Sequence, residues 1–364
     1  MKIAQFIDTL NVGGAETMLV RLSVNLAQYG HEVTIYHFGN PYIHNSCEKH
    51  GLNQVIIPFV GLYKSLLTVY IFSLKFARLL KKHKIDLLHS HLYGSITGAY
   101  FGAFIYRIPH VGTLHDLYMV QERKGRGLVL RFTQAAGTQL VSVSQNMRGF
   151  YQSYIPFSKE IMNIYNGFKW EAEPKKNTAP DIQRKNSGTI RLVVVARLIK
   201  LKRHEWLVNS LAEIIKKQNV QLFFVGDGPE QDNINAAIKN LSLENKIFLL
   251  GERNDVHEIL LTSDIFILPS ESEGLSCSII EAMSADLPCI VSNVGGNGEL
   301  VSNEINGYVF DVDDINSLNN ACNNLITHKD VREAMGAKGK ERSENIFNLQ
   351  SMTENYIKLY ASFT

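Results

Sequence analysis

The chain has 364 residues, of which 45% are apolar and 20% charged, so we expect a globular protein with room for two domains. Its four cysteines lie far apart and form no CxxC pair, which argues against a zinc site or a disulfide framework and favours a reducing, cytoplasmic compartment. No apolar run reaches membrane-spanning length, and the segment before Asp8 lacks the pattern of a signal peptide.

The first half of the chain is predicted to alternate strands with helices, which implies a parallel sheet. It begins with a strand at Lys2–Ile7, a glycine turn at Asn11–Gly14 and an amphipathic helix at Ala15–Tyr29. Further strands are predicted at Glu32–His37, Ile85–Ser90, His110–Leu114 and Gln139–Ser142, and a further helix at Leu66–His83.

A polar segment without periodicity, Glu171–Gly188, predicts a linker, after which the alternation restarts. The second half is predicted to contain strands at Ile190–Ala196, Gln221–Val225, Ile247–Leu250, Ile265–Leu268 and Cys289–Ser292, and a helix at His204–Gln218. We therefore expect an α/β protein with two doubly wound domains, residues 1–170 and 189–349. They would face each other across a deep cleft that holds the ligand at the carboxyl ends of the strands.

Residues Pro269–Glu299 are the most informative segment: a Glu-Gly turn, a short helix, an apolar strand and a Gly-Gly turn. A loop that leads into a helix start presents unpaired backbone N–H groups to an anion. Two carboxylates beside that loop, Glu273 and Glu281, can accept hydrogen bonds from sugar hydroxyls, so the arrangement suits a nucleotide-sugar. A glycosidase acid–base pair is disfavoured, because the two carboxylates would lie ~10 Å or more apart.

Charged and titratable side chains follow two other predicted strands. Arg197 and Lys202 come after the first strand of the second domain, where two cations suit a diphosphate, although ordinary loop cations would look the same. His115 and Asp116 follow the strand that ends at Leu114. A histidine there would point into the cleft and could bond a sugar hydroxyl, whereas a purely structural histidine is the alternative.

Glycine turns follow two strands, at Gly13-Gly14 and at Gly226–Pro229. Each would let the backbone approach a ligand, and each is also explained as a plain turn. The chain contains neither GxGxxG nor GxxxxGK, which lowers the prior for a dinucleotide oxidoreductase or a P-loop enzyme.

The triplet Asp311-Val312-Asp313 looks like the DxD motif of metal-dependent sugar transferases. We interpret it as a helix start with Asp313 or Asp314 as the N-cap, because no histidine or second carboxylate cluster accompanies it. No metal site is therefore expected.

The two halves of the chain differ in charge. Residues 1–170 carry 17 Lys and Arg against 8 Asp and Glu (net +9), whereas residues 171–364 carry 20 against 27 (net −7). Basic residues gather at the end of the predicted helix Leu66–His83 and again beside apolar residues at 123–132: Lys75, Arg78, Lys81, Lys82 and Lys84, then Arg123, Lys124, Arg126 and Arg131. They indicate either docking on anionic lipid or ordinary solvated surface with cations that complement a helix dipole.

Taken together, these motifs resemble the retaining glycosyltransferases of family 4, which have the GT-B fold of two Rossmann-like domains. The resemblance covers nearly the whole chain, in the order NVGGAE, GTLHD, VSVSQ, IYNGF, ARLIKLK, VGDGPE, LLGERNDV, SDIFILPSESEGLSCSIIEAM and NVGGNGELV. The segment EGLSCSIIEAM is its specific part. In this fold the last helix, near residues 350–364, crosses back to the first domain.

The resemblance implies a role for each matching residue. Arg197 and Lys202 would clamp the donor diphosphate, Glu273 would bind hydroxyls of the donor sugar, and Glu281 would hold the ribose. His115 would lie near the transferred sugar. The remaining donor-binding positions implied are Gly13, Gly14, Arg253, Asn254, Gly274, Leu275, Ser276 and Cys277.

Three positions depart from the family pattern: Ala196, Arg203 and Asp286 stand where the family usually has Gly. None of the three removes a side chain that is implied to bind the donor. They leave the local loop shape, and therefore the donor preference, open.

The resemblance implies a cytoplasmic enzyme that needs neither cofactor nor metal, and the basic first domain favours a peripheral position on the inner face of the membrane. It would move a hexose or N-acetylhexosamine from a UDP-sugar, or secondarily a GDP-sugar, to a glycan acceptor. The basic first domain favours a lipid-linked acceptor in cell-surface polysaccharide synthesis such as capsule or exopolysaccharide, with an anionic membrane as partner and no nucleic acid. A nucleotide-sugar epimerase, a non-catalytic subunit that binds nucleotide-sugars and transfer to a soluble acceptor stay as alternatives.

Overall fold

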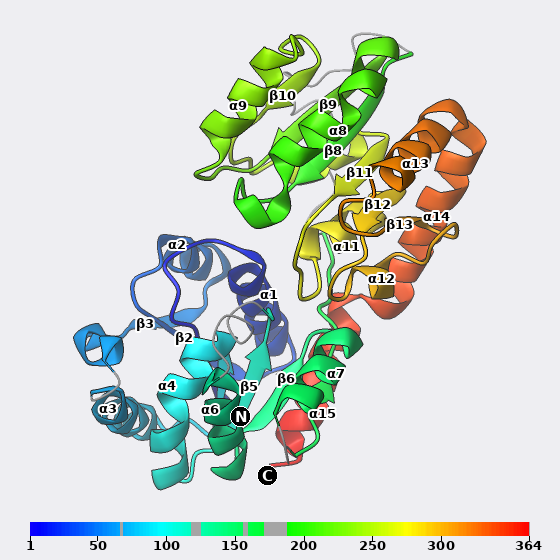
Figure 1. Ribbon diagram of the computed structural model, residues 1–364. Helices are drawn as coiled ribbons and strands as arrows, with labels where there is room; N and C mark the ends of the chain where they lie inside the picture. Colours follow the sequence, from blue (N-terminus) through cyan, green and yellow to red (C-terminus); the bar gives the residue numbers. More distant parts are fainter. Residues whose placement is uncertain (66–67, 118–124, 156–158, 171–187, 364) are drawn as a thin grey trace. The chain divides into compact units, whose positions relative to one another are not determined.

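A computed structural model describes residues 1–65, 68–117, 125–155, 159–170 and 188–363. The chain forms two compact units, each drawn in Figure 1 with its own sheet. The first unit contains Met1–Gly167 together with Leu349–Thr364, and the second contains Phe168–Asn348. Nearly all of the expected linker, Glu171–Gly188, lies outside the described residues.

Within the described residues, the sheet of the first unit has seven parallel strands in the order β3-β2-β1-β4-β5-β6-β7. In chain order the strands are β1 (Lys2–Phe6), β2 (Glu32–His37), β3 (Asn53–Ile56), β4 (Leu87–His91), β5 (His110–Leu114), β6 (Gln139–Ser142) and β7 (Met162–Asn163). The order changes direction at β1, which lies between β2 and β4. Such a reversal is where doubly wound sheets bind ligands, outside the carboxyl ends of the strands.

The helices of the first unit are α1 (Gly14–Gln28), α2 (Pro41–His50), the 3₁₀ helix η1 (Val60–Lys64), α3 (Val69–Lys82), α4 (Leu92–Ile105), α6 (Gly125–Ala135), α7 (Gln145–Tyr154) and α15 (Leu349–Ala361). The start and end of α2 show how local sequence fixes a helix. Asn40 accepts hydrogen bonds from the N–H groups of Tyr42 and Ile43, and Pro41 follows it at the first helical position. Gly51 then ends the helix in the left-handed conformation.

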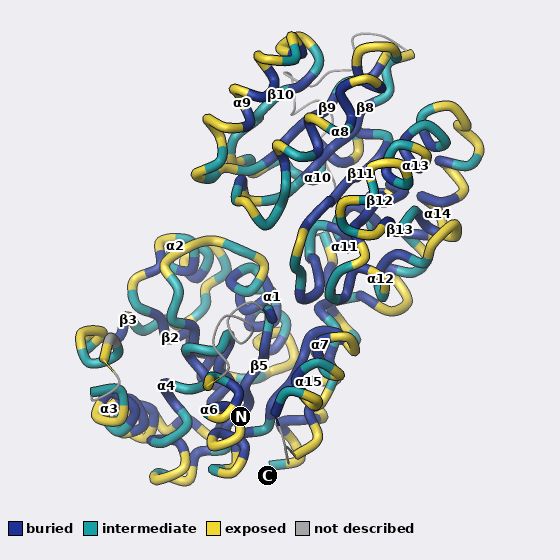
Figure 2. The backbone as a smooth tube through the Cα atoms, in the orientation of Figure 1, coloured by how far each residue is buried: buried dark blue, intermediate teal, exposed yellow. Residues whose placement is uncertain are grey.

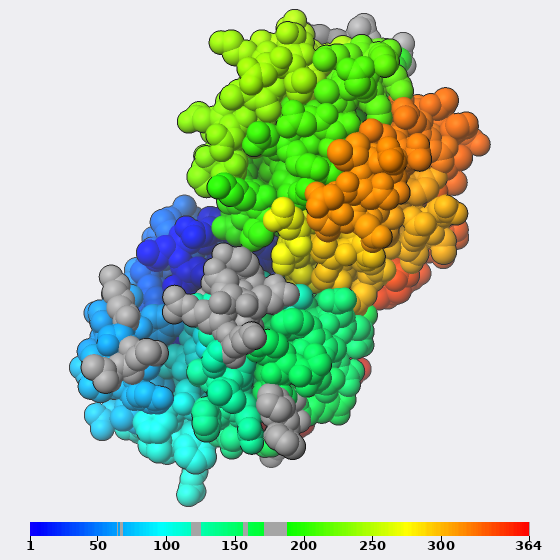
Figure 3. Space-filling view, in the orientation of Figure 1, coloured from blue at the N-terminus to red at the C-terminus, as the bar shows by residue number. Residues whose placement is uncertain are grey.

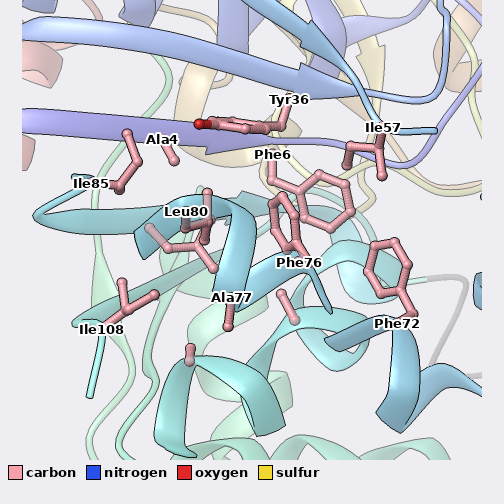
Figure 4. Packing of buried hydrophobic residues seen from close by; sticks show 13 residues of the cluster. Ala4, Phe6, Tyr36, Ile57, Phe72, Phe76, Ala77, Leu80, Ile85 and Ile108 are labelled. Carbon is pink, nitrogen blue, oxygen red and sulfur yellow. The ribbon is translucent and has the colours of Figure 1, made fainter. Parts of the chain in front are cut away.

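Aromatic residues form the core between α3 and the sheet (Figure 4). The ring of Phe76 lies 4.7 Å from that of Phe6 on β1 and 5.5 Å from that of Tyr36 on β2, centroid to centroid. Phe72 and Leu80 lie on the same face of α3 and are also buried. These apolar positions, spaced by four along the sequence, hold α3 against the sheet.

The C-terminal helix α15 belongs to the first unit although it follows the whole second unit in sequence. Its side chains contact elements from the start of the chain: the hydroxyl of Tyr29 donates to Glu354 at 3.1 Å. Tyr356 and Tyr360, one turn apart on α15, are buried. The first unit is therefore assembled from two distant stretches of sequence.

In the part of the second unit that the structure describes, the sheet has six parallel strands in the order β10-β9-β8-β11-β12-β13. They are β8 (Ile190–Val195), β9 (Val220–Val225), β10 (Ile247–Leu249), β11 (Ile265–Leu268), β12 (Cys289–Ser292) and β13 (Gly307–Phe310). The helices are η3 (Lys200–Lys202), α8 (His204–Lys217), α9 (Gln231–Asn240), α10 (Val256–Leu261), α11 (Cys277–Ser284), α12 (Asn297–Leu300), α13 (Ile315–Thr327) and α14 (Lys329–Ile346). Figure 2 shows strands buried beneath helices whose outer faces are exposed, as expected when helices cover a parallel sheet.

The expected α/β class and the two doubly wound parallel sheets are confirmed. The strand predicted at Ile85–Ser90 corresponds to β4 at Leu87–His91. It begins two residues later than predicted because the helix before it ends in the turn His83–Asp86. The helix expected from Leu66 is described from Val69 onward, and residues 66–67 lie outside the described residues. Among the helices that the structure describes, none combines the length and apolar content needed to cross a bilayer.

Candidate active site

The loop between β11 and α11 is held in place by a second loop that follows β12. The N–H of Gly296 donates to the carbonyl of Gly274 at 2.8 Å. Gly295 has a φ of +53°, and a Cβ on it would lie only 1.9 Å from the carbonyl oxygen of Glu273. The Gly-Gly turn recognised in the sequence is therefore required because its backbone packs directly on the Glu-Gly turn.

Glu273 forms an ion pair with Lys202 inside the second unit. The Lys202 Nζ lies 2.5 Å from Glu273 Oε1, and the Ser270 hydroxyl donates to the same oxygen at 2.6 Å. The side chain of Glu273 is 9% exposed and that of Lys202 18%. Residues expected to bind the sugar and the diphosphate thus meet at one point, although 71 positions separate them in the sequence.

Backbone contacts place Lys202 at that point. Lys202 ends the 3₁₀ helix η3, and the carbonyl of Leu201 in the same helix accepts the N–H of Glu271 at 2.8 Å. This bond ties the loop after β8 to the loop after β11. The ion pair is therefore built on two neighbouring strands whose carboxyl ends lie at the same edge of the sheet.

Arg197 is exposed on the loop after β8. In the part of the chain that the structure describes, its side chain makes no hydrogen bond or ion pair, so the guanidinium is available to an anion. The turn after β9 shapes this loop: a Cβ on Gly226 would lie 2.1 Å from the Ala196 carbonyl oxygen, and one on Gly228 would lie 2.4 Å from that of Leu198. The turn at Gly226–Pro229 thus has a packing function next to Arg197.

The start of α11 contains the other expected donor-binding positions. Gly274, Leu275 and Ser276 are buried in the loop, and Cys277 is the first helical residue. The Ser276 side chain makes no capping bond to the helix and pairs instead with the Ser278 hydroxyl at 3.1 Å. The N–H groups of a first helical turn have no partner within the helix, so this helix start can receive a phosphate.

Glu281 lies in the middle of α11 and is half-buried. On the loop after β10, Arg253 donates to both carboxylate oxygens of Asp255, at 2.8 and 2.7 Å. These bonds hold the pKa of Asp255 below its usual value and fix the direction of the Arg253 side chain. Asn254, between them, is exposed.

The glycine loop of the first unit leads into α1. Gly13 is the N-cap of the helix in an extended conformation, and Gly14 is its first residue. Asn40 fixes the loop by donating to the carbonyls of Thr9 and Asn11 at 3.1 and 2.9 Å. The sequence reasoning missed Asn40; its only signal was Asn before Pro41, which marks a helix start.

His115 follows β5 and is linked to a second histidine. Its Nε2 lies 3.0 Å from His91 Nδ1, and burial lowers the pKa of His115 to about 4, so the ring is neutral at pH 7. The neighbouring Asp116 accepts a hydrogen bond from the Tyr151 hydroxyl through its backbone carbonyl, at 2.6 Å. His91 was also missed in the sequence, where the signal available was the HSH triplet at the carboxyl end of β4.

The acidic segment with aspartates at 311, 313 and 314 leads into a helix start, as expected. The Asp314 side chain accepts the N–H of Ser317 and is the N-cap of α13. The other two carboxylates have partners, since Asp311 accepts from Asn293 at 3.0 Å and Asp313 pairs with Arg203. In the described residues no group of three or more metal-ligating side chains is found.

Two of the three departures from the glycine pattern now have a physical explanation. Arg203 and Asp286 have φ values of +57° and +61°, the left-handed region that glycine adopts without strain. Arg203 is the N-cap of α8, and its side chain contacts Glu271 at 3.5 Å and lies 4.3 Å from the ring of Trp206. The chain therefore keeps the loop conformation while adding side-chain contacts to it.

Comparison with known protein families finds a match in each half of the chain. The profile described as "Glycosyltransferase Family 4" matches residues 12–169, and that of "Glycosyl transferases group 1" matches residues 175–342. The UDP-Gal:alpha-D-GlcNAc-diphosphoundecaprenol alpha-1,3-galactosyltransferase of Escherichia coli is 30% identical over 82% of this chain and 79% of its own length. The N-acetyl-alpha-D-glucosaminyl L-malate synthase of Bacillus anthracis is 26% identical over 96% and 94%.

Among solved structures, HepE of Anabaena in complex with UDP-glucose superposes with a TM-score of 0.86, at 21% identity and over the full length of both chains. Two parallel-sheet units of this topology, together with these matches, define a glycosyltransferase of the GT-B fold. The chain belongs to glycosyltransferase family 4.

Proposed function

We propose that this glycosyltransferase moves a hexose or an N-acetylhexosamine from a UDP-sugar, or secondarily a GDP-sugar, to a lipid-linked glycan with retention of anomeric configuration. The observation that carries the proposal is the ion pair of Lys202 with Glu273 beside the start of α11. Two of the proteins compared support the choice of donor and acceptor by their names. The relative from E. coli takes UDP-Gal and a diphosphoundecaprenol-linked sugar, and HepE was solved with UDP-glucose.

In this proposal the cations of the second unit bind the donor diphosphate. Lys202 is a point charge held by Glu273, and Arg197 presents a guanidinium to solvent. As the bond from the anomeric carbon to the diphosphate oxygen breaks, negative charge grows on that oxygen, and both cations stabilise it more in the transition state than in the ground state. The site therefore needs no divalent metal for this charge.

Carboxylates hold the sugar and the ribose. Glu273 keeps one oxygen on Lys202 and Ser270, and its other oxygen would accept a hydroxyl of the donor sugar. Glu281, half-buried on α11, would accept the ribose hydroxyls, and the loop of Arg253 and Asn254 would border the base.

On the first unit, the backbone at Gly13 and Gly14 and the side chain of His115 would face the transferred sugar. The acceptor hydroxyl would attack the anomeric carbon from the face that the diphosphate leaves, which keeps the anomeric configuration. We assign no residue as a covalent nucleophile.

A lipid-linked acceptor is supported by one surface of the first unit, which we call the basic apolar face. It lies on α3, α4 and α6. The helices α3 and α4 pack side by side, and Figure 3 shows the adjoining light-blue and cyan surface of this part of the chain. Its exposed apolar residues are Tyr70, Ile71, Phe104, Ile105, Leu128 and Phe132, and its exposed basic residues are Lys75, Arg78, Lys81, Lys82, Arg107 and Arg131. Such a combination suits the interface of an anionic membrane. Arg123 and Lys124, expected in the same surface, lie outside the described residues.

The test of donor binding is a calorimetric panel of UDP, GDP, ADP and their sugar conjugates in EDTA. We expect binding of UDP and one UDP-sugar, and a large loss in the variant Arg197→Ala, Lys202→Ala. Binding only after a divalent metal is restored would overturn the metal-free clamp. Transfer to an undecaprenyl-diphosphate-linked sugar, with the product anomer assigned by NMR, tests acceptor and retention; an isomerised UDP-sugar formed without acceptor would identify an epimerase instead.

A further inference from the structure

A hydrogen-bonded chain of three side chains ends at His115 in the first unit. His91 Nε2 lies 2.7 Å from Gln5 Oε1, and His91 Nδ1 lies 3.0 Å from His115 Nε2. Gln5 is on β1, His91 ends β4, and His115 follows β5, so the chain crosses three adjacent strands at their carboxyl ends. In the part of the chain that the structure describes, His115 makes no other hydrogen bond.

The chemistry of these atoms decides which one donates the proton in each of the two hydrogen bonds. The amide oxygen of Gln5 can only accept, so His91 Nε2 carries the proton. His91 is 1% exposed and burial keeps its pKa well below the usual value, so it is neutral and has a single ring proton. Its Nδ1 is therefore an acceptor, and the hydrogen bond to it must come from His115 Nε2–H.

A second set of contacts fixes the His91 ring from behind. The ring of His89 lies 4.1 Å from it, centroid to centroid. His89 is itself bonded at both nitrogens, to the Tyr360 hydroxyl on α15 and to the Thr113 hydroxyl on β5, each at 2.7 Å. His89 cannot turn without breaking both bonds, so the His91 ring packs against a fixed neighbour.

We propose that Gln5 and His91 are positioning residues that hold His115 as the Nε2–H tautomer, which leaves Nδ1 as a hydrogen-bond acceptor for substrate. The inference rests on the proposed function only in that His115 meets the transferred sugar. It deepens that function, because a neutral ring that offers a lone pair binds a hydroxyl group and repels a phosphate oxygen. His115 would thus recognise a sugar hydroxyl and would take no part in neutralising the diphosphate.

The direct test is the tautomer of His115 in the full-length protein, read from ¹⁵N chemical shifts and two-bond couplings of ¹⁵N-histidine-labelled enzyme at pH 7. We expect a protonated Nε2 and an unprotonated Nδ1. An Nδ1–H tautomer or an imidazolium would overturn the proposal. This result does not depend on activity, so inactivity of the wild-type enzyme towards every UDP-sugar would refute the proposed function and leave the tautomer assignment standing.

Two variants of His91 separate positioning from packing. His91→Asn offers an amide oxygen near the place of Nδ1, so we expect it to keep the His115 tautomer and most of the kcat. His91→Phe fills the space without an acceptor, and we expect mixed tautomers and a fall of about tenfold in kcat with little change in donor KM. An unchanged tautomer in His91→Phe would refute the positioning role.

Gln5→Leu tests the far end of the chain if His91→Phe fails to fold. It removes the oxygen that sets the His91 proton, so His115 should again show mixed tautomers; a single Nε2–H form would contradict the role of Gln5. His110→Asn is the matched control. His110 is an equally buried histidine on β5 whose bonds go to Thr138 and Ser90, so its loss should leave the His115 signals unchanged.

Discussion

Lys202 and Glu273 meet at 2.5 Å although one follows β8 and the other follows β11. The two strands are neighbours in the second sheet, so their carboxyl ends bring the loops together. The cation proposed to bind the diphosphate is thereby oriented by the carboxylate proposed to bind the sugar, and the loss of either side chain is expected to affect the other.

Glu273→Ala should abolish sugar transfer, by about 10²-fold or more in kcat, while UDP binding largely survives. In the proposed site the sugar hydroxyl would lose its acceptor and Lys202 its orienting partner, but Arg197 and the start of α11 would still bind the nucleotide. Steady-state transfer and calorimetry with UDP measure the two effects. Glu271→Ala, which removes a half-exposed carboxylate two residues away, is the control. Full activity of Glu273→Ala would refute the site.

Gly295→Ala should lower both stability and activity. The new methyl group would lie 1.9 Å from the carbonyl oxygen of Glu273 at a φ of +53°, so the loop that holds Glu273 must move. We expect a loss of about 1–3 kcal/mol in the free energy of unfolding and weaker transfer. A Cβ added at the nearby Gly298 would have its nearest neighbour 3.8 Å away. The variant Gly298→Ala should therefore resemble wild type in urea unfolding and in transfer assays.

Substituting glycine at the two left-handed positions should affect stability to different degrees. Asp286→Gly relieves backbone strain and removes only the exposed pair with Lys340, so its stability should stay within about 1 kcal/mol of wild type. Arg203→Gly relieves the same strain but loses the contacts to Glu271, Asp313 and Trp206, and we expect a loss of about 1–3 kcal/mol. Equal urea midpoints for the two variants would contradict this.

Stability should fall between pH 7 and pH 5. Burial lowers the pKa of His110 to about 3 and that of His115 to about 4, whereas both titrate near 6.5 in the unfolded chain. As the pH falls through that value, only the unfolded chain takes up these protons, which costs about 2 kcal/mol per histidine at pH 5. Urea unfolding at both pH values measures the loss. His110→Asn should show a smaller loss than wild type, and an equal loss would argue against the neutral buried form.

Charge reversal on the basic apolar face should weaken binding to anionic vesicles. The double variant Lys81→Glu/Lys82→Glu reverses the charge of two exposed lysines at the end of α3. Each lysine is expected to contribute about 1 kcal/mol to the free energy of binding an anionic surface. Sedimentation with phosphatidylglycerol vesicles at low salt measures this binding. Lys216→Glu, Lys217→Glu, at the end of α8 in the second unit, provides the same charge change elsewhere. Equal binding by both variants, or none by wild type, would remove the membrane from the proposal.

The sequence predicted those parts of the fold that depend on short apolar runs. β2, β5, β6, β11 and β12 have the expected bounds, because buried parallel strands are nearly continuous apolar segments between turns. It missed α2, whose sequence PYIHNSCEKH buries only Ile43 and Cys47 and so has little apolar periodicity. It also missed β7, since two residues contain no pattern at all.

For the candidate site, the sequence located residue types at strand ends but not their pairing. Lys202 and Glu273 were assigned to different parts of the donor, and only the sheet order shows that they touch. The chain from Gln5 to His115 was invisible for a different reason. His115 was recognised as a candidate, but Gln5 and His91 look like ordinary core residues of two strands, and only side-chain geometry shows that the hydrogen bonds of the three run in one direction.

The position of α15 has a consequence for synthesis of the protein on the ribosome. Its tyrosines supply hydroxyl partners for His89 and Thr113, which lie in strands made more than two hundred residues earlier. Until the last helix emerges from the exit tunnel, those two buried groups lack their tyrosine partners, whereas the second unit is continuous in sequence and already complete. The nascent chain is therefore expected to finish its second unit before its first.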